Sequence, residues 1–442
     1  MTRVRRFALS LLAAAAALPA AAQERPTVVV TPLGSARSFR VALQSFADRS
    51  PAPARSLPER LRQGIADGLE YSDVFQLLDP AAFLGPTTTP SLEGDPPVCS
   101  DWTPIGADAL VQGEVERGAE QLAVRFHVWD TTRCQLLLRK RYAQEAGISP
   151  DGVARRIADD IVAAFVGVRG VSATEMAFVS DRGGNSEIYV MDANGGNVRR
   201  TTSIGSINNF PGWSPGGDRI VFTSYRHRNR PFLFSVTPGN GQPRLFLSRL
   251  APELQQYRGV FDPSGERLAV VMSDGGAAEI YTVGRDGRQL RQLTHDRAID
   301  VSPTWSPDGS RIAFVSDRTG SPQIYVMEAD GGNAQRLTFN GSYNTSPTWS
   351  PDGSWIAYES RVAGQLDIWL IDPDRGTNVP LVTHPRNDEG PTWAPNGLKL
   401  AFSSSRRGRH DIYVFDLGSE RLRQITRDAG NNRSPAWGGF PR

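Results

Sequence analysis

The sequence predicts an α/β domain followed by an all-β, six-bladed β-propeller that is closed by the C-terminal strand. The main observation is an aromatic residue before a tight turn that recurs along the second part of the chain. Its positions are Trp213, Phe261, Trp305, Trp349, Trp393 and Trp437. The first interval is 48 residues and the other four are 44 residues each, the length of a four-stranded propeller blade. There are two further observations. Apolar residues recur at helical spacing in the first part of the chain, and the repeat begins and ends partway through a period.

The chain begins with the pattern of a secretory signal peptide. Residues 1–6 are basic, residues 7–18 are apolar, and a run of small residues ends at Ala22. We therefore expect cleavage between Ala22 and Gln23 and export of the mature chain. A membrane anchor is the alternative, but this apolar run is shorter than the roughly 20 residues that span a bilayer.

The charge balance gives no support to nucleic-acid binding. The full chain has 49 Lys and Arg residues against 47 Asp and Glu residues, and three of the arginines lie in the signal peptide. The mature chain therefore has a net charge near −1, without the basic surface that nucleic-acid binding requires.

Residues 23–168 show the mixed pattern of a small α/β domain. Strands are expected at residues 26–34, 107–116, 121–131 and 134–143. Two helices are expected because apolar residues recur at helical spacing. They are Leu57, Leu61, Ile65 and Leu69 in the first helix, and Val153, Ile157, Ile161, Val162 and Phe165 in the second.

The two cysteines, Cys99 and Cys134, both lie in this domain. In an exported chain they could form a disulfide, which would close a loop of about 35 residues and add roughly 3–4 kcal/mol by the chain-entropy model. Two unpaired thiols are an equally open alternative. A metal site is not expected, since no histidine lies nearby at ligand spacing.

Each period of the repeat divides into four expected strands, here named a to d in chain order. In the period around Trp305, residues 306–310 (SPDGS) have the composition of a tight turn between strands a and b. Strand b is the run Arg311–Ser316, strand c is residues 323–329 and strand d is residues 334–339. Strand b is apolar on both faces, as expected for a blade packed between two neighbours.

The count of strands gives the number of blades. Strands b and c each occur six times, but the first strand b, at Met176, has no strand a before it. The last strand a, Ser434–Trp437, has no strand b after it. The C-terminal strand would therefore complete the first blade, which removes two open sheet edges. This interpretation assigns residues 171–442 to the propeller.

The motifs that suggest catalysis have a simpler explanation in the repeat. Ser214 matches the G-x-S-x-G pattern of hydrolase nucleophiles, but it occupies the same turn position as Ser306 and Ser350. None of the five histidines has metal-ligand spacing. We predict neither a catalytic residue nor a cofactor.

The loops on one face of the propeller are the best candidates for binding a partner. The b–c loops contain arginines and the d–a loops contain polar residues, and both sets lie opposite the a–b and c–d turns. Since the d–a loops lead into the innermost strands, their side chains should converge at the channel mouth. Ordinary solvated loops are the alternative. The d–a candidates are Gln255, Gln256, Asp300, Asn344 and Asn432.

The sequence resembles the TolB family, the periplasmic components of the Tol-Pal system. The resemblance is carried by the repeat unit at residues 302–338 (SPTWSPDGSRIAFVSDRTGSPQIYVMEADGGNAQRLT), by residues 101–116 (DWTPIGADALVQGEVE) and by residues 157–182. It covers nearly the whole mature chain, including the order of the domains. One departure is Phe261 in place of Trp, with a longer loop before it.

The resemblance implies a periplasmic, non-catalytic and monomeric scaffold that supports outer-membrane integrity and cell division. The propeller mouth would bind the lipoprotein Pal, with Gln255, Gln256, Asp300, Asn344 and Asn432 as the candidate contacts. Some colicins would exploit the same site. The segment after the signal peptide would bind the inner-membrane protein TolA, with Gln23, Val28, Val30 and Pro32 as the candidate residues.

Two other classes of protein use similar repeats. One is the regulatory propeller of a prolyl-oligopeptidase-like or tricorn-like peptidase, which would require a hydrolase domain on the same chain. The other is a propeller that binds a sugar or another small ligand, for which no distinctive residue is found.

Overall fold

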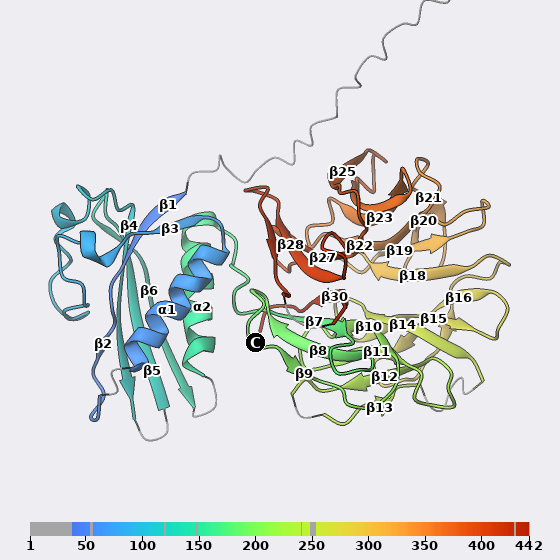
Figure 1. Cartoon of the computed structure of the whole chain (residues 1–442), viewed down its shortest axis with the longest axis horizontal. Helices are drawn as coiled ribbons and strands as arrows, with labels where there is room; N and C mark the ends of the chain where they lie inside the picture. The colour runs from blue at the N-terminus through green and yellow to red at the C-terminus, as the bar shows by residue number, and fades with distance from the viewer. Residues whose placement is uncertain are drawn as a thin grey trace, which may run out of the picture.

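The structure is a computed structural model that describes residues 38–53, 56–118, 121–145, 149–239, 241–247, 253–427 and 430–441. This part of the chain contains an α/β domain followed by a six-bladed β-propeller (Figure 1), which confirms the predicted fold class. The expected signal peptide and the strand at residues 26–34 lie outside the described residues.

The sheet of the first domain has the strand order β3-β1-β4-β5-β6, with β2 paired to β4. Strand β1 runs parallel to β3 and β4, whereas β4, β5 and β6 are antiparallel neighbours. The strands are β1 (Phe39–Leu43), β2 (Ala47–Asp48), β3 (Phe75–Leu77), β4 (Ala109–Arg117), β5 (Gln121–Asp130) and β6 (Gln135–Glu145).

Two helices, α1 (Ser56–Tyr71) and α2 (Pro150–Val166), cover one face of this sheet (Figure 1). They pack closely because α1 presents glycine to α2: a Cβ atom on Gly64 would lie 2.7 Å from Cβ of Ala154. The predicted apolar stripes of both helices are buried against the sheet. The helices therefore leave the other face of the sheet to be covered by other segments.

The second face is partly covered by the segment between β3 and β4, which contains short 3-10 helices at Pro80–Ala82 and Cys99–Asp101. Trp102 packs there against Ala42 and Leu110 and is almost fully buried. A disulfide joins Cys99 to Cys134 in the turn between β5 and β6. The disulfide thus ties this segment to the sheet and leaves the rest of the face open.

The propeller consists of six four-stranded antiparallel sheets, each with the strand order a-b-c-d. The first blade contains both ends of the propeller and consists of β30 (Asn432–Trp437), β7 (Glu175–Ser180), β8 (Glu187–Asp192) and β9 (Arg199–Arg200), and the second consists of β10 (Asn208–Trp213), β11 (Ile220–Ser224), β12 (Phe232–Val236) and β13 (Arg244–Leu245). The third blade consists of β14 (Gln255–Phe261), β15 (Arg267–Ser273), β16 (Ala278–Gly284) and β17 (Arg291–Gln292), and the fourth of β18 (Asp300–Trp305), β19 (Arg311–Ser316), β20 (Gln323–Glu328) and β21 (Gln335–Arg336). The fifth blade consists of β22 (Asn344–Trp349), β23 (Ile356–Val362), β24 (Gln365–Ile371) and β25 (Asn378–Val382), and the sixth of β26 (Asp388–Trp393), β27 (Lys399–Ser404), β28 (Asp411–Asp416) and β29 (Leu422–Gln424).

The C-terminal strand β30 closes the ring by pairing with β7, from Asn432 opposite Ser180 to Trp437 opposite Met176. Closure of the ring by the last strand, as the out-of-phase repeat predicted, is therefore confirmed. The aromatic residue at the end of strand a links successive blades. The indole Nε1 of Trp305 donates to the Val260 carbonyl of the preceding blade at 3.2 Å.

Each strand a also contains a bulge, which explains the proline of the SPxW repeat. In five blades the pairing of strands a and b shifts after the second residue, and the third residue has a positive φ, for example 54° at Ser302. In β14, which contains no proline, the shift comes one residue later and the positive φ is at Arg258. A proline such as Pro303 fits here because it has no N–H to donate to the neighbouring strand. The bulge bends strand a where it lines the channel.

The two domains share a buried cluster of charges. Asp73, just after α1, has a side chain only 2% exposed and forms ion pairs with three propeller cations. These are Lys399 at 3.3 Å, Arg421 at 2.9 Å and Arg423. Lys399 also pairs with Asp416. Because both acids and Lys399 are buried, removal of Asp73 would leave cations with too few partners.

The linker between the domains is held by a second buried carboxylate. Asp159 of α2 accepts hydrogen bonds from the backbone N–H groups of Ser172 at 2.7 Å and Ala173 at 3.0 Å. Burial raises the pKa of Asp159 to about 6, although these donors act in the opposite direction. The linker is therefore fixed to the first domain on one side and leads directly into β7 on the other.

We predict that Asp73→Ala lowers the free energy of unfolding by about 3–5 kcal/mol, the usual cost of leaving a buried partner uncompensated. Urea denaturation measures this change. The control is Asp67→Ala on α1, where within the described residues the carboxylate contacts only the exposed Gln63 amide and the expected change is within about 0.5 kcal/mol. Equal denaturation midpoints for the two variants would contradict an interface held by Asp73.

Candidate functional site

The six a strands line the central channel of the propeller. A cavity of about 350 Å³ lies between them, with walls formed by the bulged middle and end of each strand a. We call the end of the channel where the a strands begin the mouth. It is bordered by the b–c loops and by the d–a loops, of which residues 201–207, 293–299, 337–343 and 383–387 are described in full.

A polar residue at the start of each strand a anchors the mouth from beneath. Asn344 donates through Nδ2 to Oε1 of Gln323 at 2.8 Å, and Asn432 makes the same contact with Oδ1 of Asp411 at 3.1 Å. Asn208 contacts Glu187 in the same way. In each case the partner is the first residue of strand c in the preceding blade, so this contact ties neighbouring blades together at the mouth.

Arginines of the b–c loops complete this framework. Arg318 bonds to Asp300 at 2.8 Å and lies over the Tyr325 ring at 4.9 Å. Arg406 is held in the same way by Asp388 and Tyr413. Charge-assisted hydrogen bonds and cation–π contacts together fix each guanidinium. These arginines are therefore part of the blades rather than free to meet a partner.

The structure places the five predicted mouth residues at the base of the mouth, with little free surface. Gln256, Asp300, Asn344 and Asn432 are fully buried, and Gln255 is half-buried, with its carbonyl oxygen accepting from the Tyr257 hydroxyl. Their contact with a partner stays a prediction. Their observed contacts are with their own blade and with the preceding one, so they act on the shape of the loops above them.

Exposed apolar side chains above these anchors form the more accessible part of the mouth. Ile207 is 53% exposed and Ile299 is 50% exposed, and each immediately precedes the buried first residue of a strand a. Phe339, in another d–a loop, is 72% exposed and lies against the Arg336 guanidinium. All three lie in d–a loops at the mouth, and exposed large apolar side chains are candidates for contact with another protein.

Sequence reasoning missed these residues because it looked only for polar side chains in the loops. The signal that could have found them is an apolar residue directly before the polar start of strand a, as in Ile207-Asn208 and Ile299-Asp300. A residue at that position follows a loop and precedes a buried anchor, so it has no neighbouring strand to cover it.

The channel behind the mouth is lined by charges of both signs, the buried Glu359 and the half-buried Arg258. The carboxylate of Glu359 accepts from the backbone N–H of Gly390 at 2.6 Å. Burial raises the pKa of Glu359, whereas this hydrogen bond and the charge of Arg258 lower it. Burial likewise lowers the pKa of Arg258, which lies above the Phe210 ring. A partner segment that enters the channel would meet both the carboxyl group of Glu359 and the guanidinium of Arg258.

The geometry gives no support to a hydrolase site in the described residues. The Ser214 hydroxyl donates to Asp218 at 2.7 Å within the a–b turn, at the end opposite the mouth. His410 contacts both Ser403 and Glu389 through Nδ1, at 3.1 and 3.6 Å. A serine–histidine–acid relay would use both ring nitrogens. The described residues also contain no group of three or more metal-ligating side chains.

None of the helices in the described part of the chain has the length and apolarity needed to cross a membrane.

Two family models match the chain. The TolB amino-terminal domain matches residues 27–137, and the TolB beta propeller domain matches residues 255–440. The chain is 37% identical over 315 residues to the Tol-Pal system protein TolB of Anaeromyxobacter dehalogenans strain 2CP-1, covering 69% of this chain and 68% of that protein. The protein of the same name from Anaeromyxobacter sp. strain K is 37% identical over 68% of this chain and 67% of its own length.

A solved structure has a similar fold over most of the chain. The crystal structure of TolB from Acinetobacter baumannii matches with a TM-score of 0.74, covering 92% of this chain and 97% of that chain. The sequence identity of that pair is 22%, so this likeness concerns the fold alone.

Proposed function

The chain belongs to the TolB family of Tol-Pal system proteins, and from this premise we propose that it is a periplasmic, non-catalytic adaptor. Its propeller mouth binds a Pal-like outer-membrane lipoprotein, and its N-terminal segment binds TolA. Through these two contacts it supports outer-membrane integrity and cell division. Colicins that imitate the lipoprotein would use the same mouth.

The observation that carries the lipoprotein part of this proposal is the difference between the two ends of the propeller. Ile207, Ile299 and Phe339 are exposed at the mouth, above a layer of buried polar anchors. The a–b and c–d turns at the other end are built from Asp, Asn, Gly and Ser, as at residues 306–310 and 329–333. An apolar rim around a channel with charged walls suits a folded partner that inserts a polar loop.

The TolA part of the proposal rests on the family alone. Gln23, Val28, Val30 and Pro32 lie outside the described residues, as does the cleavage site between Ala22 and Gln23. The division into residues 1–22, 23–168 and 171–442 also stays a proposal.

The alternative of a peptidase propeller has less support. The serine of its candidate motif is engaged within a turn at the end opposite the mouth, and the described channel histidine does not form a catalytic relay. An adaptor therefore remains the function that the site supports best.

We predict that Ile299→Asp weakens binding of a Pal-like lipoprotein at least tenfold, a loss of about 1.4 kcal/mol or more, because a charge would be buried in an apolar contact. Isothermal titration with the soluble domain of the lipoprotein measures the affinity. The matched control is Val198→Asp in a c–d turn, where the side chain is 41% exposed at the opposite end.

The control variant should bind like the unmodified protein, and both variants should melt at the unmodified temperature since both positions are exposed. Unaltered affinity in Ile299→Asp, or an equal loss in Val198→Asp, would place the lipoprotein elsewhere on the molecule.

We also predict that deletion of residues 23–35 abolishes binding to TolA and leaves lipoprotein binding and the melting temperature unchanged. Surface-immobilised TolA measures the first effect, and the titration above measures the second. Retained TolA binding would show that the N-terminal segment is not the TolA site.

A further inference from the structure

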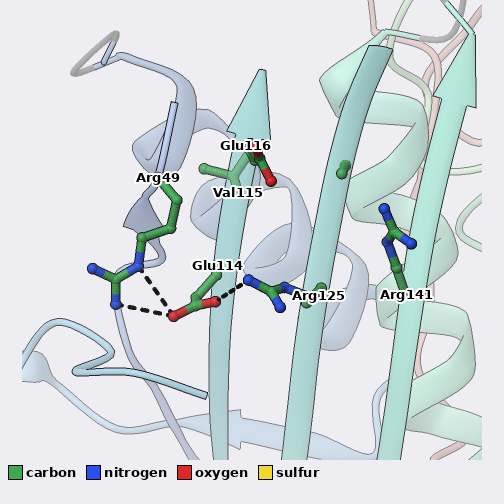
Figure 2. Close-up of a pocket in the computed structure, with 7 residues that line it drawn as sticks. Arg49, Glu114, Val115, Glu116, Arg125 and Arg141 are labelled. Carbon is green, nitrogen blue, oxygen red and sulfur yellow. Dashed lines mark hydrogen bonds and ion pairs between the residues drawn. The ribbon is translucent and has the colours of Figure 1, made fainter. Parts of the chain in front are cut away.

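The open face of the first domain contains a hollow that the adaptor function does not use. It lies over β4, β5 and β6, on the side of the sheet away from α1 and α2, and has a volume of about 270 Å³ (Figure 2). Its lining includes Arg49, Glu114, Glu116, Ala123, Arg125 and Arg141. This volume is slightly below the usual range of small-molecule pockets, so the hollow suits a ligand of one or two residues rather than a large cofactor.

A buried carboxylate makes one wall of the hollow rigid. Glu114 has a side chain only 4% exposed and accepts hydrogen bonds from Arg49 and from Arg125, each at 2.9 Å (Figure 2). The backbone N–H of Leu92 donates to the same carboxylate at 3.2 Å, and Arg125 is held on its other side by Glu93 at 2.8 Å. Both guanidinium groups are therefore fixed before any ligand arrives, which lowers the entropic cost of binding.

The other wall contains two opposite charges that do not pair. Glu116 on β4 and Arg141 on β6 are both exposed, and within the described residues neither side chain makes a hydrogen bond or an ion pair. They are kept apart by β5, because Glu116 is opposite Ala123 while Arg141 is opposite Arg125. Two strand spacings across the sheet and two residues along the strand together place their Cα atoms roughly 12 Å apart. The small side chain of Ala123 leaves the space between them open.

These unpaired charges define the chemistry of a ligand. A simple anion would satisfy Arg141 but would meet the carboxylate of Glu116, and a simple cation would meet the guanidinium groups instead. A ligand with a carboxylate at one end and an ammonium group at the other satisfies both. The planar fork of a guanidinium matches a carboxylate in particular.

We propose that this hollow binds a short zwitterionic peptide. Its carboxylate is held by Arg141 with Arg125, its ammonium group is held by Glu116, and its backbone lies over Ala123. The site lies in the first domain, away from the propeller mouth, and the proposal does not rest on the adaptor function.

The test uses the full mature chain and the dipeptide dialanine, with binding followed by two-dimensional NMR titration. N-acetyl-dialanine lacks the ammonium charge and dialanine amide lacks the carboxylate. We expect each capped form to bind at least tenfold more weakly than dialanine. This comparison needs no mutation, so it stands even if a variant fails to fold.

Two variants assign the ends of the ligand. Arg141→Gln should weaken dialanine about tenfold and reduce the difference in affinity between dialanine and its amide, with Arg125 still able to contact the carboxylate. Glu116→Gln should weaken dialanine and make dialanine and its N-acetyl form bind equally. The control is Arg139→Gln, an exposed arginine on the same strand and the same face that does not line the hollow, and it should leave the affinity unchanged.

Three results would overturn the proposal. Binding of N-acetyl-dialanine as tight as dialanine would identify a simple anion site. An equal loss in Arg139→Gln and Arg141→Gln would identify a general effect of surface charge. The absence of saturable shifts with dialanine at millimolar concentration would show that the hollow has no such ligand.

Discussion

The pairing of β30 with β7 is the contact on which the rest of the structure depends. It joins the end of the chain to the first strand after the linker, and the two strands share one blade. The indole of Trp437 donates to the Thr174 hydroxyl at 2.9 Å, and the N–H of Gly438 donates to the Glu175 carbonyl. The same contact that closes the ring therefore also fixes the residues that lead from the first domain. Without it the a strands would not form a closed channel, and the mouth would not exist as one surface.

The fold could be predicted from the sequence because the sequence features that form a blade recur in each blade. Five blades share the a–b turn, and all six share a buried strand b and an aromatic residue at the end of strand a, so the period and its phase are visible without a structure. The site could not be predicted in the same way. Asn344 and Asn432 are polar residues at the end of a loop, a pattern typical of solvent exposure, but strand a begins beneath the loop and buries them. The side chains that reach solvent are apolar, as at Ile207 and Ile299, and composition alone would place them in the core.

The buried anchors and the exposed rim have complementary roles. Hydrogen bonds from strand a to strand c, together with arginines such as Arg318 that are stacked on tyrosine, hold each loop in one position. The apolar residues above them are therefore presented on a rigid base. A rigid apolar surface loses little conformational entropy when a partner binds, which favours affinity from a small number of contacts. The charged hollow of the first domain follows the same rule, since Glu114 fixes two of its arginines in advance.

Hydrogen exchange of the full chain, measured by mass spectrometry with and without the soluble domain of a Pal-like lipoprotein, tests the central claim most directly. Exchange reports which backbone amides become protected when a surface is covered. The account predicts new protection in the d–a loops at residues 203–207, 295–299 and 339–343, and none in the c–d turns at residues 193–198 and 329–334. Protection of the c–d turns in place of the d–a loops would contradict the assignment of the mouth as the partner-binding surface.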